Sequence, residues 1–356
     1  MNEFPEGKAI VYCEGAFGTT NGKTAHGLVR RSRRYDVSSI IDSLCAGRDA
    51  GEILDGKAIG LPVVGNLNAA LSRDGVTHFV VGLAPDGGRL DSTTRAAVCQ
   101  AIRAGLHVDS GLHDFLADDL EIGALAARCR VKIRDVRKPP HPKELHFFSG
   151  KIAEVDSLRI ALLGTDSAVG KRTTAWILVD ALRAAGHSAE LIGTGQTSWL
   201  QGARYGIVLD SLVNDFVSGE IEHAVWSCWS EQLPEVMVLE GQGSLLNPAY
   251  PGGMELLAAA RPQVVVLQHA PKRTHYDGFP NHAMHPLDRQ IQAVKVLSGR
   301  PVVAVTINHE GLNREQVREA CARIRESTGL PAVDVLVDGP LPLMEALQPF
   351  LTRAKA

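Results

Sequence analysis

A chain of 356 residues is long for one hydrophobic core, so its length predicts two domains. Hydrophobic residues make up 45% and charged residues 22%, as in ordinary globular proteins, and a formal charge of -3 excludes the basic surface that nucleic-acid binding requires. The six cysteines form no CxxC pair, and the N-terminal MNEFPEGKAIVYCEG resembles neither a signal peptide nor a membrane span, so we expect a cytoplasmic protein without nucleic-acid or membrane partners.

The first part of the chain alternates strand-like and helix-like segments. This alternation predicts βαβ units and a parallel sheet. The loop at 14–27, EGAFGTTNGKTAHG, follows a strand and contains GKT, but its glycine spacing fits no phosphate-binding motif. We expect a solvated loop there, with a second anion site as the alternative. Strands are predicted at 9–13, 37–41, 77–83 and 106–108, and helices at 67–72, 92–104 and 115–129.

A proline-rich, polar stretch then predicts a linker at 141–157, between domains at 1–140 and 158–356. The second domain repeats the α/β pattern with fully apolar runs, which are typical of strands buried on both faces of a doubly wound parallel sheet. Ligands of such sheets lie beyond the carboxyl ends of the strands. Strands are predicted at 158–163, 189–192, 235–239, 263–268, 302–307 and 333–337, and helices at 171–185, 210–231, 286–298, 313–327 and 341–353.

The sequence GTDSAVGKRTT at 164–174 has the parts of a phosphate-binding loop. It follows an apolar strand, two glycines bracket the turn, and Lys171 opens a helical segment whose N-terminus favours an anion. The glycines lie one residue further apart than in the common P-loop pattern. A simple strand-to-helix turn is the alternative interpretation.

GTDSAVGK resembles the GTDTxVGKT loop of dethiobiotin synthetases, and LEGQGS at 239–244 resembles their EGxGG stretch. Those enzymes place a Mg²⁺-binding Thr directly after the Lys, whereas this chain has Arg172 there and its threonines follow at Thr173 and Thr174. The departure argues against ATP cleavage, although a local bend that brings Thr173 to the metal position would restore it.

The whole chain is similar to a family with a Rossmann-like N-terminal domain joined to a dethiobiotin-synthetase-like P-loop domain, long described only as a domain of unknown function. The loop, the LEGQGS stretch and HAPKRTHYDG at 269–278 carry this resemblance. Members have been assigned as D-glutamate N-acetyltransferases. The resemblance therefore implies acetyl-CoA as cosubstrate and an acidic D-amino acid as acceptor, in amino-acid catabolism.

A P-loop that holds coenzyme A needs no metal, because no γ-phosphoryl group is transferred. Arg172 would then contact phosphate oxygens in place of Mg²⁺. Asn308 lies where related P-loop proteins read an adenine, and an Asx turn is the alternative there. The predicted coenzyme-binding residues are Gly164, Thr165, Asp166, Ser167, Ala168, Val169, Gly170, Lys171, Arg172, Thr173, Thr174 and Asn308.

The predicted catalytic residues are Glu240, Lys171 and Asp210. Glu240 ends a strand beside GQGS, where a carboxylate can accept the proton that the substrate ammonium must lose; a structural capping carboxylate is the alternative. Asp210 lies where the synthetases keep an acidic residue near their metal, but it also begins a predicted helix and is a candidate N-cap. The backbone N–H groups of 241–244 are candidate oxyanion donors. Cys228 is a candidate acyl carrier, but we expect it to be buried as a small hydrophobic residue.

Polar residues beyond other strand ends are predicted to bind the substrate. Lys272 and Arg273 are expected to contact its carboxylates, and a solvated loop is the alternative. His282 and His285 are three residues apart, but Cys ligands are absent nearby and Pro286 disrupts a regular helix there, so we expect no metal site. The predicted substrate-binding residues are Gln196, Thr197, Arg204, Gln242, Gly243, Ser244, His269, Lys272, Arg273 and His275.

Together with the family resemblance, the sequence thus predicts a homo-oligomeric N-acetyltransferase that uses acetyl-CoA and a small acidic amino acid and holds no metal. One alternative is a ligase or kinase that uses ATP and Mg²⁺, as dethiobiotin synthetase does. The other is a nucleotide-sensing module without turnover.

Overall fold

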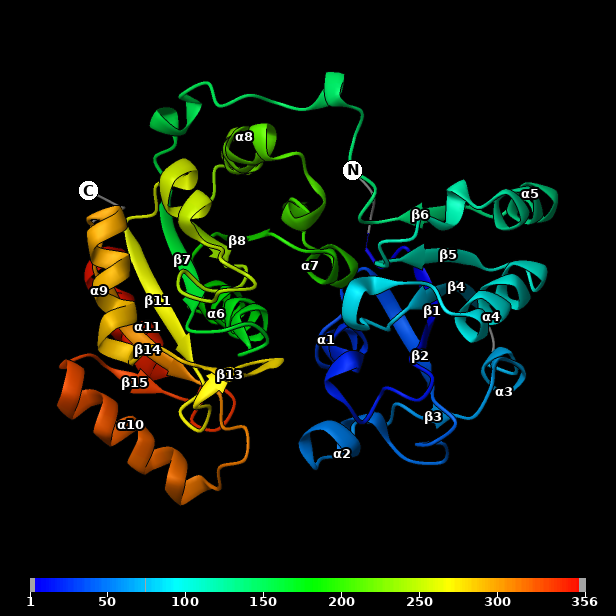
Figure 1. Cartoon of the computed structure of the whole chain (residues 1–356), viewed down its shortest axis with the longest axis horizontal. Helices are drawn as coiled ribbons and strands as arrows, with labels where there is room; N and C mark the ends of the chain where they lie inside the picture. Colours follow the sequence, from blue (N-terminus) through cyan, green and yellow to red (C-terminus); the bar gives the residue numbers. More distant parts are fainter. Residues whose placement is uncertain (1–3, 74, 352–356) are drawn as a thin grey trace. The chain divides into compact units, whose positions relative to one another are not determined.

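The computed structural model describes residues 4–73 and 75–351 and divides the chain into two compact units. The N-terminal unit contains the residues up to 140 together with the segment 196–203. The P-loop unit contains residues 141–195 and those from 204 onward. The unit boundaries therefore differ from the contiguous predicted domains at 196–203, and Figure 1 labels the elements of both units.

A six-stranded parallel sheet forms the centre of the N-terminal unit. Its order, β3-β2-β1-β4-β5-β6, is that of Rossmann folds, and all neighbouring strands pair in parallel. The predicted parallel α/β domain is therefore confirmed. The strands are β1 (Gly7–Tyr12), β2 (Tyr35–Ile41), β3 (Val63–Val64), β4 (Val76–Val81), β5 (His107–Ser110) and β6 (Ile133–Asp135).

Helices cover both faces of this sheet, each over its own hydrophobic core. One cluster joins the sheet to α3, α4 and α5, and the other joins it to α1, α2 and α7. The carboxylates of Asp91 and Asp119 accept backbone N–H groups at the starts of α4 and α5, which fixes where these helices begin. The helices are α1 (Lys23–Arg30), α2 (Ala50–Asp55), α3 (Leu67–Leu71), α4 (Ser92–Arg103) and α5 (Leu120–Cys129).

Helix α7 (Gln196–Gln201) belongs to the N-terminal unit although β8 and β9 of the P-loop unit flank it in the chain. It lies beside α1 (Figure 1). Leu200 is fully buried in the cluster under α1, and the Arg34 guanidinium lies 3.6 Å from the Trp199 ring and donates to its carbonyl. The Gln201 amide donates to the carbonyl of Gly27 at 2.7 Å. Apolar packing and hydrogen bonds thus hold the segment in this unit.

The P-loop unit contains a seven-stranded sheet of order β15-β14-β11-β7-β10-β8-β9. Its neighbouring strands pair in parallel, so their carboxyl ends meet at one edge. Strands β12 (His275–Tyr276) and β13 (Phe279–Ala283) form a separate hairpin. The sheet strands are β7 (Leu158–Gly164), β8 (Ala189–Gly193), β9 (Tyr205–Gly206), β10 (Val236–Glu240), β11 (Val264–His269), β14 (Val302–Ile307) and β15 (Ala332–Val333).

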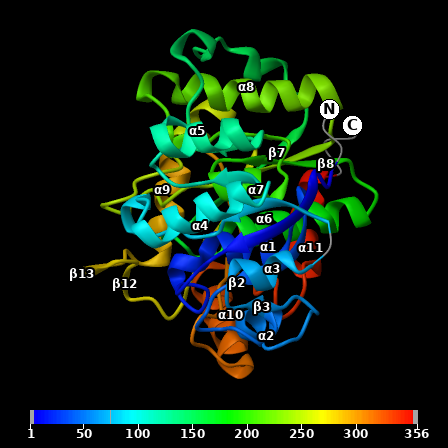
Figure 2. The same cartoon turned by 90° about the vertical axis from the view of Figure 1, so that its right-hand side faces the viewer.

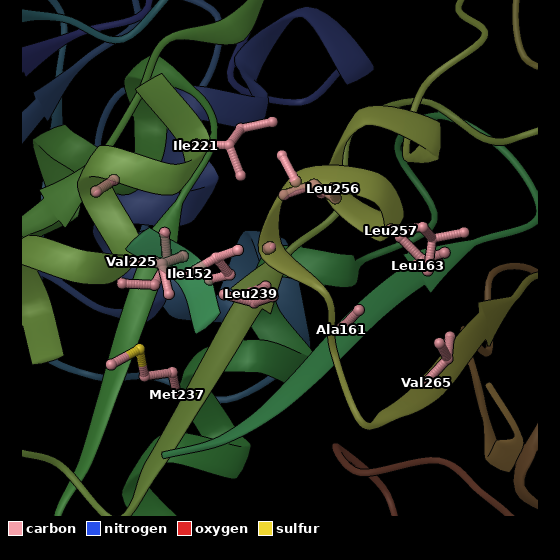
Figure 3. Close-up of a cluster of buried hydrophobic side chains, with 14 of the residues drawn as sticks. Ile152, Ala161, Leu163, Ile221, Val225, Met237, Leu239, Leu256, Leu257 and Val265 are labelled. Atoms are coloured by element: carbon pink, nitrogen blue, oxygen red, sulfur yellow. The ribbon is translucent and has the colours of Figure 1, made fainter. Parts of the chain in front are cut away.

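Helices also cover this second sheet. Helix α6 packs against β7, β8 and β10 with α11 beside it, while α8, the π-helical turn η7 and α9 enclose the hydrophobic cluster of Figure 3. That cluster includes Leu239 of β10, Leu163 of β7 and Val225 of α8. Figure 2 shows α8 along its length. The helical elements are α6 (Lys171–Ala184), α8 (Asn214–Gln232), η7 (Leu256–Ala260), α9 (Leu287–Ser298), α10 (Arg314–Thr328) and α11 (Leu341–Leu351).

Three predicted elements are corrected by the structure. The strand expected at 333–337 ends at Val333, because the carboxylate of Asp334 accepts the N–H groups of Leu336 and Val337 and closes a turn. The helix expected at 210–231 begins only at Asn214. The helix expected at 115–129 is a short 3-10 turn followed by α5.

The remaining differences concern short elements and the chain end. The sequence does not predict helices α1, α2 and α7 or strands β3, β6, β9, β12 and β13; all of them have eight residues or fewer. The last two residues of the helix predicted at 341–353 lie outside the described residues. Within 4–73 and 75–351, none of the helices has the length and apolar composition needed to cross a membrane.

The core of Figure 3 gives a first test. Leu239→Ala should lower the free energy of unfolding by roughly 2–5 kcal/mol, because it opens a cavity in a fully buried cluster. The matched control Leu341→Ala, at a side chain that is 72% exposed, should stay within about 0.5 kcal/mol of wild type. Urea unfolding followed by tryptophan fluorescence measures both, and equal losses would contradict the assignment of this core.

Candidate functional site

The loop predicted to bind phosphate lies between β7 and α6, at the carboxyl end of the central strand of the P-loop unit. Both bracketing glycines are required by the geometry. A Cβ on Gly164 would lie 2.8 Å from the Lys171 side chain, and Gly170 has a φ of 101°, a conformation that L residues with a Cβ rarely adopt. The turn therefore brings the backbone and Lys171 close together at the start of a 14-residue helix.

Lys171 is buried at the centre of this loop. Its Nζ donates to the carbonyls of Asp166 at 2.8 Å and Gly243 at 2.7 Å. Burial lowers the pKa of Lys171 to about 8, although the nearby carboxylates of Glu240 and Asp166 oppose that shift. A buried ammonium whose hydrogen bonds to the described residues go to carbonyls is a favourable partner for a phosphate, which would bring a compensating negative charge.

Asp166 joins three loops of the P-loop unit through its fully buried carboxylate. One oxygen accepts the backbone N–H of Ser167 at 2.7 Å and the side-chain amide of Asn247 at 2.9 Å. The other accepts the Arg273 guanidinium at 3.1 Å and the backbone N–H of Asp277 at 2.9 Å. The Asp166 side chain, which is predicted to bind the coenzyme, therefore bonds to protein groups and supports the loop in the structure.

Arg273 also has a different partner from the one predicted. Its Nη1 donates to Asp166 and to the carbonyl of Ser167 at 2.8 Å, and its Nη2 donates to Glu310 at 2.7 Å. These contacts occupy the guanidinium with protein groups, and its contact with a substrate carboxylate stays a prediction. Lys272 is exposed and uses one N–H on the carbonyl of Gly311 at 2.7 Å, so it keeps donor capacity for a ligand.

Asn308 makes the Asx turn that was the alternative to reading an adenine. Its side-chain oxygen accepts the N–H of Glu310 at 3.0 Å, and its amide donates to the carbonyl of Val169 at 3.1 Å. Both ends of the side chain thus hold backbone. The Asx-turn alternative is therefore confirmed, and the adenine contact stays a prediction.

The hydroxyl groups of the loop are partly occupied as well. Thr174 donates to the buried side-chain oxygen of Gln268 at 2.7 Å, and Thr165 shares a 3.0 Å hydrogen bond with Nδ1 of His269. Burial lowers the pKa of His269 to about 4, so its ring is neutral at physiological pH. Arg172 and Thr173 are both half-buried at the helix start.

The stretch after β10 lies beside Lys171. Glu240 is 6% exposed, and one of its oxygens accepts the N–H of Thr194 at 3.3 Å. Gln242 donates to the carbonyl of Thr194 at 2.6 Å. A Cβ on Gly243 would lie 2.0 Å from the Tyr250 carbonyl, so only glycine fits where the backbone meets Lys171.

Two of the four predicted oxyanion donors in this stretch are already used. The N–H of Gly241 donates to Leu162 and that of Ser244 donates to Tyr250, both to backbone carbonyls. The side chain of Ser244 differs, because its hydroxyl is buried and has no hydrogen-bond partner among the described residues. An orphaned buried hydroxyl next to Gly243 is a group that a ligand could satisfy.

The other predicted residues are spread more widely. Gln196 and Thr197 belong to the N-terminal unit, where the Thr197 hydroxyl bonds that of Thr24 at 3.0 Å. Asp210 is exposed in a 3-10 turn before α8 and is not its N-cap, which is Val213. Arg204 and His275 are exposed. The P-loop unit thus brings together the 164–174 loop with Glu240, Gln242, Gly243, Ser244, His269, Lys272, Arg273 and Asn308.

Cys228 and the histidine pair lie in different surroundings. Cys228 is fully buried in the cluster under α8, and burial raises the pKa of its thiol, as expected for a small hydrophobic residue. Over the described ranges, His282 and His285 do not belong to any group of three or more metal-binding side chains.

The loop at 14–27 is held by a buried carboxylate of the N-terminal unit. Asp42, at the end of β2, accepts the N–H groups of Phe17 at 2.8 Å and Leu44 at 2.8 Å. Rossmann folds that bind dinucleotides use an acidic residue in this region for a ribose. Here that carboxylate organises the loop, and from Lys23 onward the predicted loop is helix α1.

Several residues of the site were missed from the sequence. Gln268 receives hydrogen bonds from Thr174 and Thr306 inside the sheet. Its only sequence signal is a polar residue in the apolar run VVVLQ. Asn247 and Glu310 carry no motif, because their roles depend on loops that meet only in the folded sheet.

Comparison with known proteins places the chain in a family. A family model described as the P-loop domain of a domain of unknown function, DUF1611, matches residues 146–344, and its Rossmann-like N-terminal companion matches residues 43–139. The chain belongs to the DUF1611 family. A crystal structure of a DUF1611 protein from Anabaena variabilis matches 97% of this chain and 100% of its own, with a TM-score of 0.89 and 30% identity.

Two other relatives carry a functional name. A protein of Pseudoalteromonas sp. called D-glutamate N-acetyltransferase is 31% identical over 275 residues, which are 74% of this chain and 79% of that protein. A protein of the same name from Tritonibacter scottomollicae is 29% identical over 77% of this chain and 81% of its own. The resemblance inferred from the sequence is confirmed for the DUF1611 family and its two domain types.

The buried lysine of this DUF1611 chain predicts a pH-dependent stability. Lys171→Met should raise the free energy of unfolding by about 1–3 kcal/mol at pH 7, because folding no longer buries a charge. Between pH 8 and 10.5 the folded wild type loses this proton while the unfolded chain keeps it. The unfolded state then binds more protons, so wild-type stability rises with pH and the advantage of the variant shrinks.

Denaturant unfolding at pH 7, 8, 9 and 10 measures this difference, and Lys272→Met, at an exposed lysine, is the control. The control should show no comparable pH dependence. A difference between Lys171→Met and wild type that is constant across this pH range would contradict the lowered pKa.

Proposed function

We propose that this DUF1611 protein is an N-acetyltransferase that moves the acetyl group of acetyl-CoA to the amine of D-glutamate. The observation that carries the proposal is the name shared by two relatives that align over 74% and 77% of the chain. The geometry of the P-loop unit supports a phosphate-bearing donor. The proposal also agrees with the sequence analysis, which predicts that the loop binds a phosphate compound and does not cleave it.

Coenzyme A carries phosphate groups that suit the residues around the loop. Lys171 and the start of α6 would hold a phosphate, and the orphaned hydroxyl of Ser244 is a further polar group for the ligand. The Thr174 hydroxyl is bonded to Gln268, and Arg172 stands in the position that magnesium-dependent P-loops give to Ser or Thr. These contacts favour binding of a phosphate compound over transfer of its phosphoryl group.

The transfer itself needs an uncharged amine. Its nitrogen attacks the thioester carbonyl, the C–N bond forms, the C–S bond breaks, and coenzyme A leaves with the sulfur as thiolate or thiol. The nitrogen must give up one proton on entering the reaction and a second as the amide forms. Glu240 is the proposed acceptor, because it is a buried carboxylate at a strand end beside Lys171.

The acceptor's carboxylates require cationic partners. Lys272 keeps this proposed role, whereas Arg273 is bound to Asp166 and Glu310. D-glutamate as the acceptor rests on the relatives' names, and the residues support an acidic amino acid.

The decisive assay follows free thiol. Wild-type protein with acetyl-CoA and D-glutamate should release coenzyme A in excess EDTA, and mass spectrometry should find N-acetyl-D-glutamate in equal amount. L-Glutamate and D-alanine test the stereochemistry and the need for the side-chain carboxylate. Turnover that requires ATP and Mg²⁺ would replace the proposal with a ligase, and tight nucleotide binding without any turnover would replace it with a sensor.

The role of Lys171 in coenzyme binding has its own test. Lys171→Ala should raise the dissociation constant for coenzyme A by roughly 10-fold to 100-fold, because a charge-assisted hydrogen bond to phosphate is lost. Lys295→Ala, on α9 and outside the loop, is the matched control and should bind as wild type does. Isothermal titration calorimetry gives both constants. Equal constants for Lys171→Ala and wild type would remove Lys171 from the binding site.

A further inference from the structure

Side chains from other strand ends hold three successive carbonyls of the phosphate-binding loop. Arg273 donates to the carbonyl of Ser167 at 2.8 Å and, in a longer contact of 3.5 Å, to that of Ala168. Asn308 donates to the carbonyl of Val169 at 3.1 Å. The donors follow β11 and β14, which lie on the same side of β7 in the sheet.

Fixing a carbonyl also fixes the next N–H group. A trans peptide is planar, so the C=O of one residue and the N–H of the next point in opposite directions. The carbonyls of Ser167, Ala168 and Val169 are directed toward Arg273 and Asn308. The N–H groups of Ala168, Val169 and Gly170 must then face away from those side chains, as a row of anion donors requires.

The backbone of Ala168 shows that this arrangement works against local preference. Its φ is 53°, in the left-handed region that a Cβ disfavours. Among the described residues, three other non-glycine residues have positive φ, and each follows the last turn of a helical element, where that conformation is common. They are Arg130, Leu233 and Arg261. Ala168 instead lies before a helix, so contacts from outside the loop must hold it.

We propose that Arg273 and Asn308 are positioning residues that hold the loop in its phosphate-binding shape before any ligand arrives. Asp166 orients Arg273 from one side through a fully buried carboxylate, and Glu310 contacts it from the more exposed side. The inference rests on the proposed function only in taking a phosphate as the ligand of this loop.

Preorganisation makes a specific prediction about rescue. Arg273→Gln should weaken coenzyme A binding by roughly 10-fold or more, because Ala168 leaves the left-handed conformation and the N–H groups of the loop no longer face the same side. Ala168→Gly alone should change binding by about twofold or less. In the Arg273→Gln background it should recover about fivefold, since glycine adopts the left-handed conformation without penalty. A residue that acts only on global stability would not be rescued in this way.

Matched variants separate the contributions of the two ion pairs that Arg273 makes, with Asp166 and with Glu310. Glu310→Gln, at a carboxylate that is 54% exposed, should leave the dissociation constant within about twofold of wild type, whereas Asp166→Asn should weaken binding as Arg273→Gln does. Asn308→Ala tests the third carbonyl and should weaken binding by about fivefold. Under the proposed activity these changes should raise KM for acetyl-CoA and leave kcat at saturation within about threefold.

Calorimetry with coenzyme A and with inorganic pyrophosphate measures binding, and thermal unfolding confirms that each variant is folded. Wild-type affinity in Arg273→Gln, or no recovery in the double variant, would overturn the inference; if Arg273→Gln does not fold, wild-type affinity in Asn308→Ala would do so. If wild type binds pyrophosphate but not coenzyme A, the acetyl-CoA proposal fails and the pyrophosphate constants still decide the positioning role. Binding of neither probe by wild type would overturn both.

Discussion

The buried carboxylate of Asp166 is the contact on which the rest of the candidate site depends. It sits at the edge where parallel strands end, and it accepts four hydrogen bonds from three different loops. Removing a carboxylate from water is unfavourable unless such donors replace the water. The loops after β7, β10 and β11 therefore meet at one charged oxygen pair, and the position of each depends on the others.

The candidate site contains two kinds of polar residue. Asp166, Arg273 and Asn308 contact the protein with most of their polar atoms, and they set the shape of the loop. Lys171 and Ser244 are buried with fewer hydrogen-bond partners. Lys171 donates to two carbonyls, and the Ser244 hydroxyl has no partner among the described residues. Stability comes from the first group, and the second group leaves room for a ligand.

Sequence reasoning located the loop but missed the protein partners of several side chains around it. The spacing of Gly164, Gly170 and Lys171 reflects local geometry, and local geometry is visible in a motif. The partners of Arg273 and Asn308 depend on which strands are neighbours, and the order β14-β11-β7 cannot be deduced from residues far apart in the chain. The sequence therefore assigns Arg273 and Asn308 to ligand contacts and misses the carboxylates and backbone carbonyls that they contact in the structure.

The same limit explains why the segment 196–203 was predicted with the P-loop domain, although Leu200 and Trp199 pack into the N-terminal unit. This membership has a consequence for the order of synthesis. As the chain leaves the ribosome, residues up to 140 emerge first, but their unit still lacks a buried side chain of its own core. It can be completed only after α6 and β8 of the later unit have been translated, so part of the P-loop unit is made before the N-terminal core is complete.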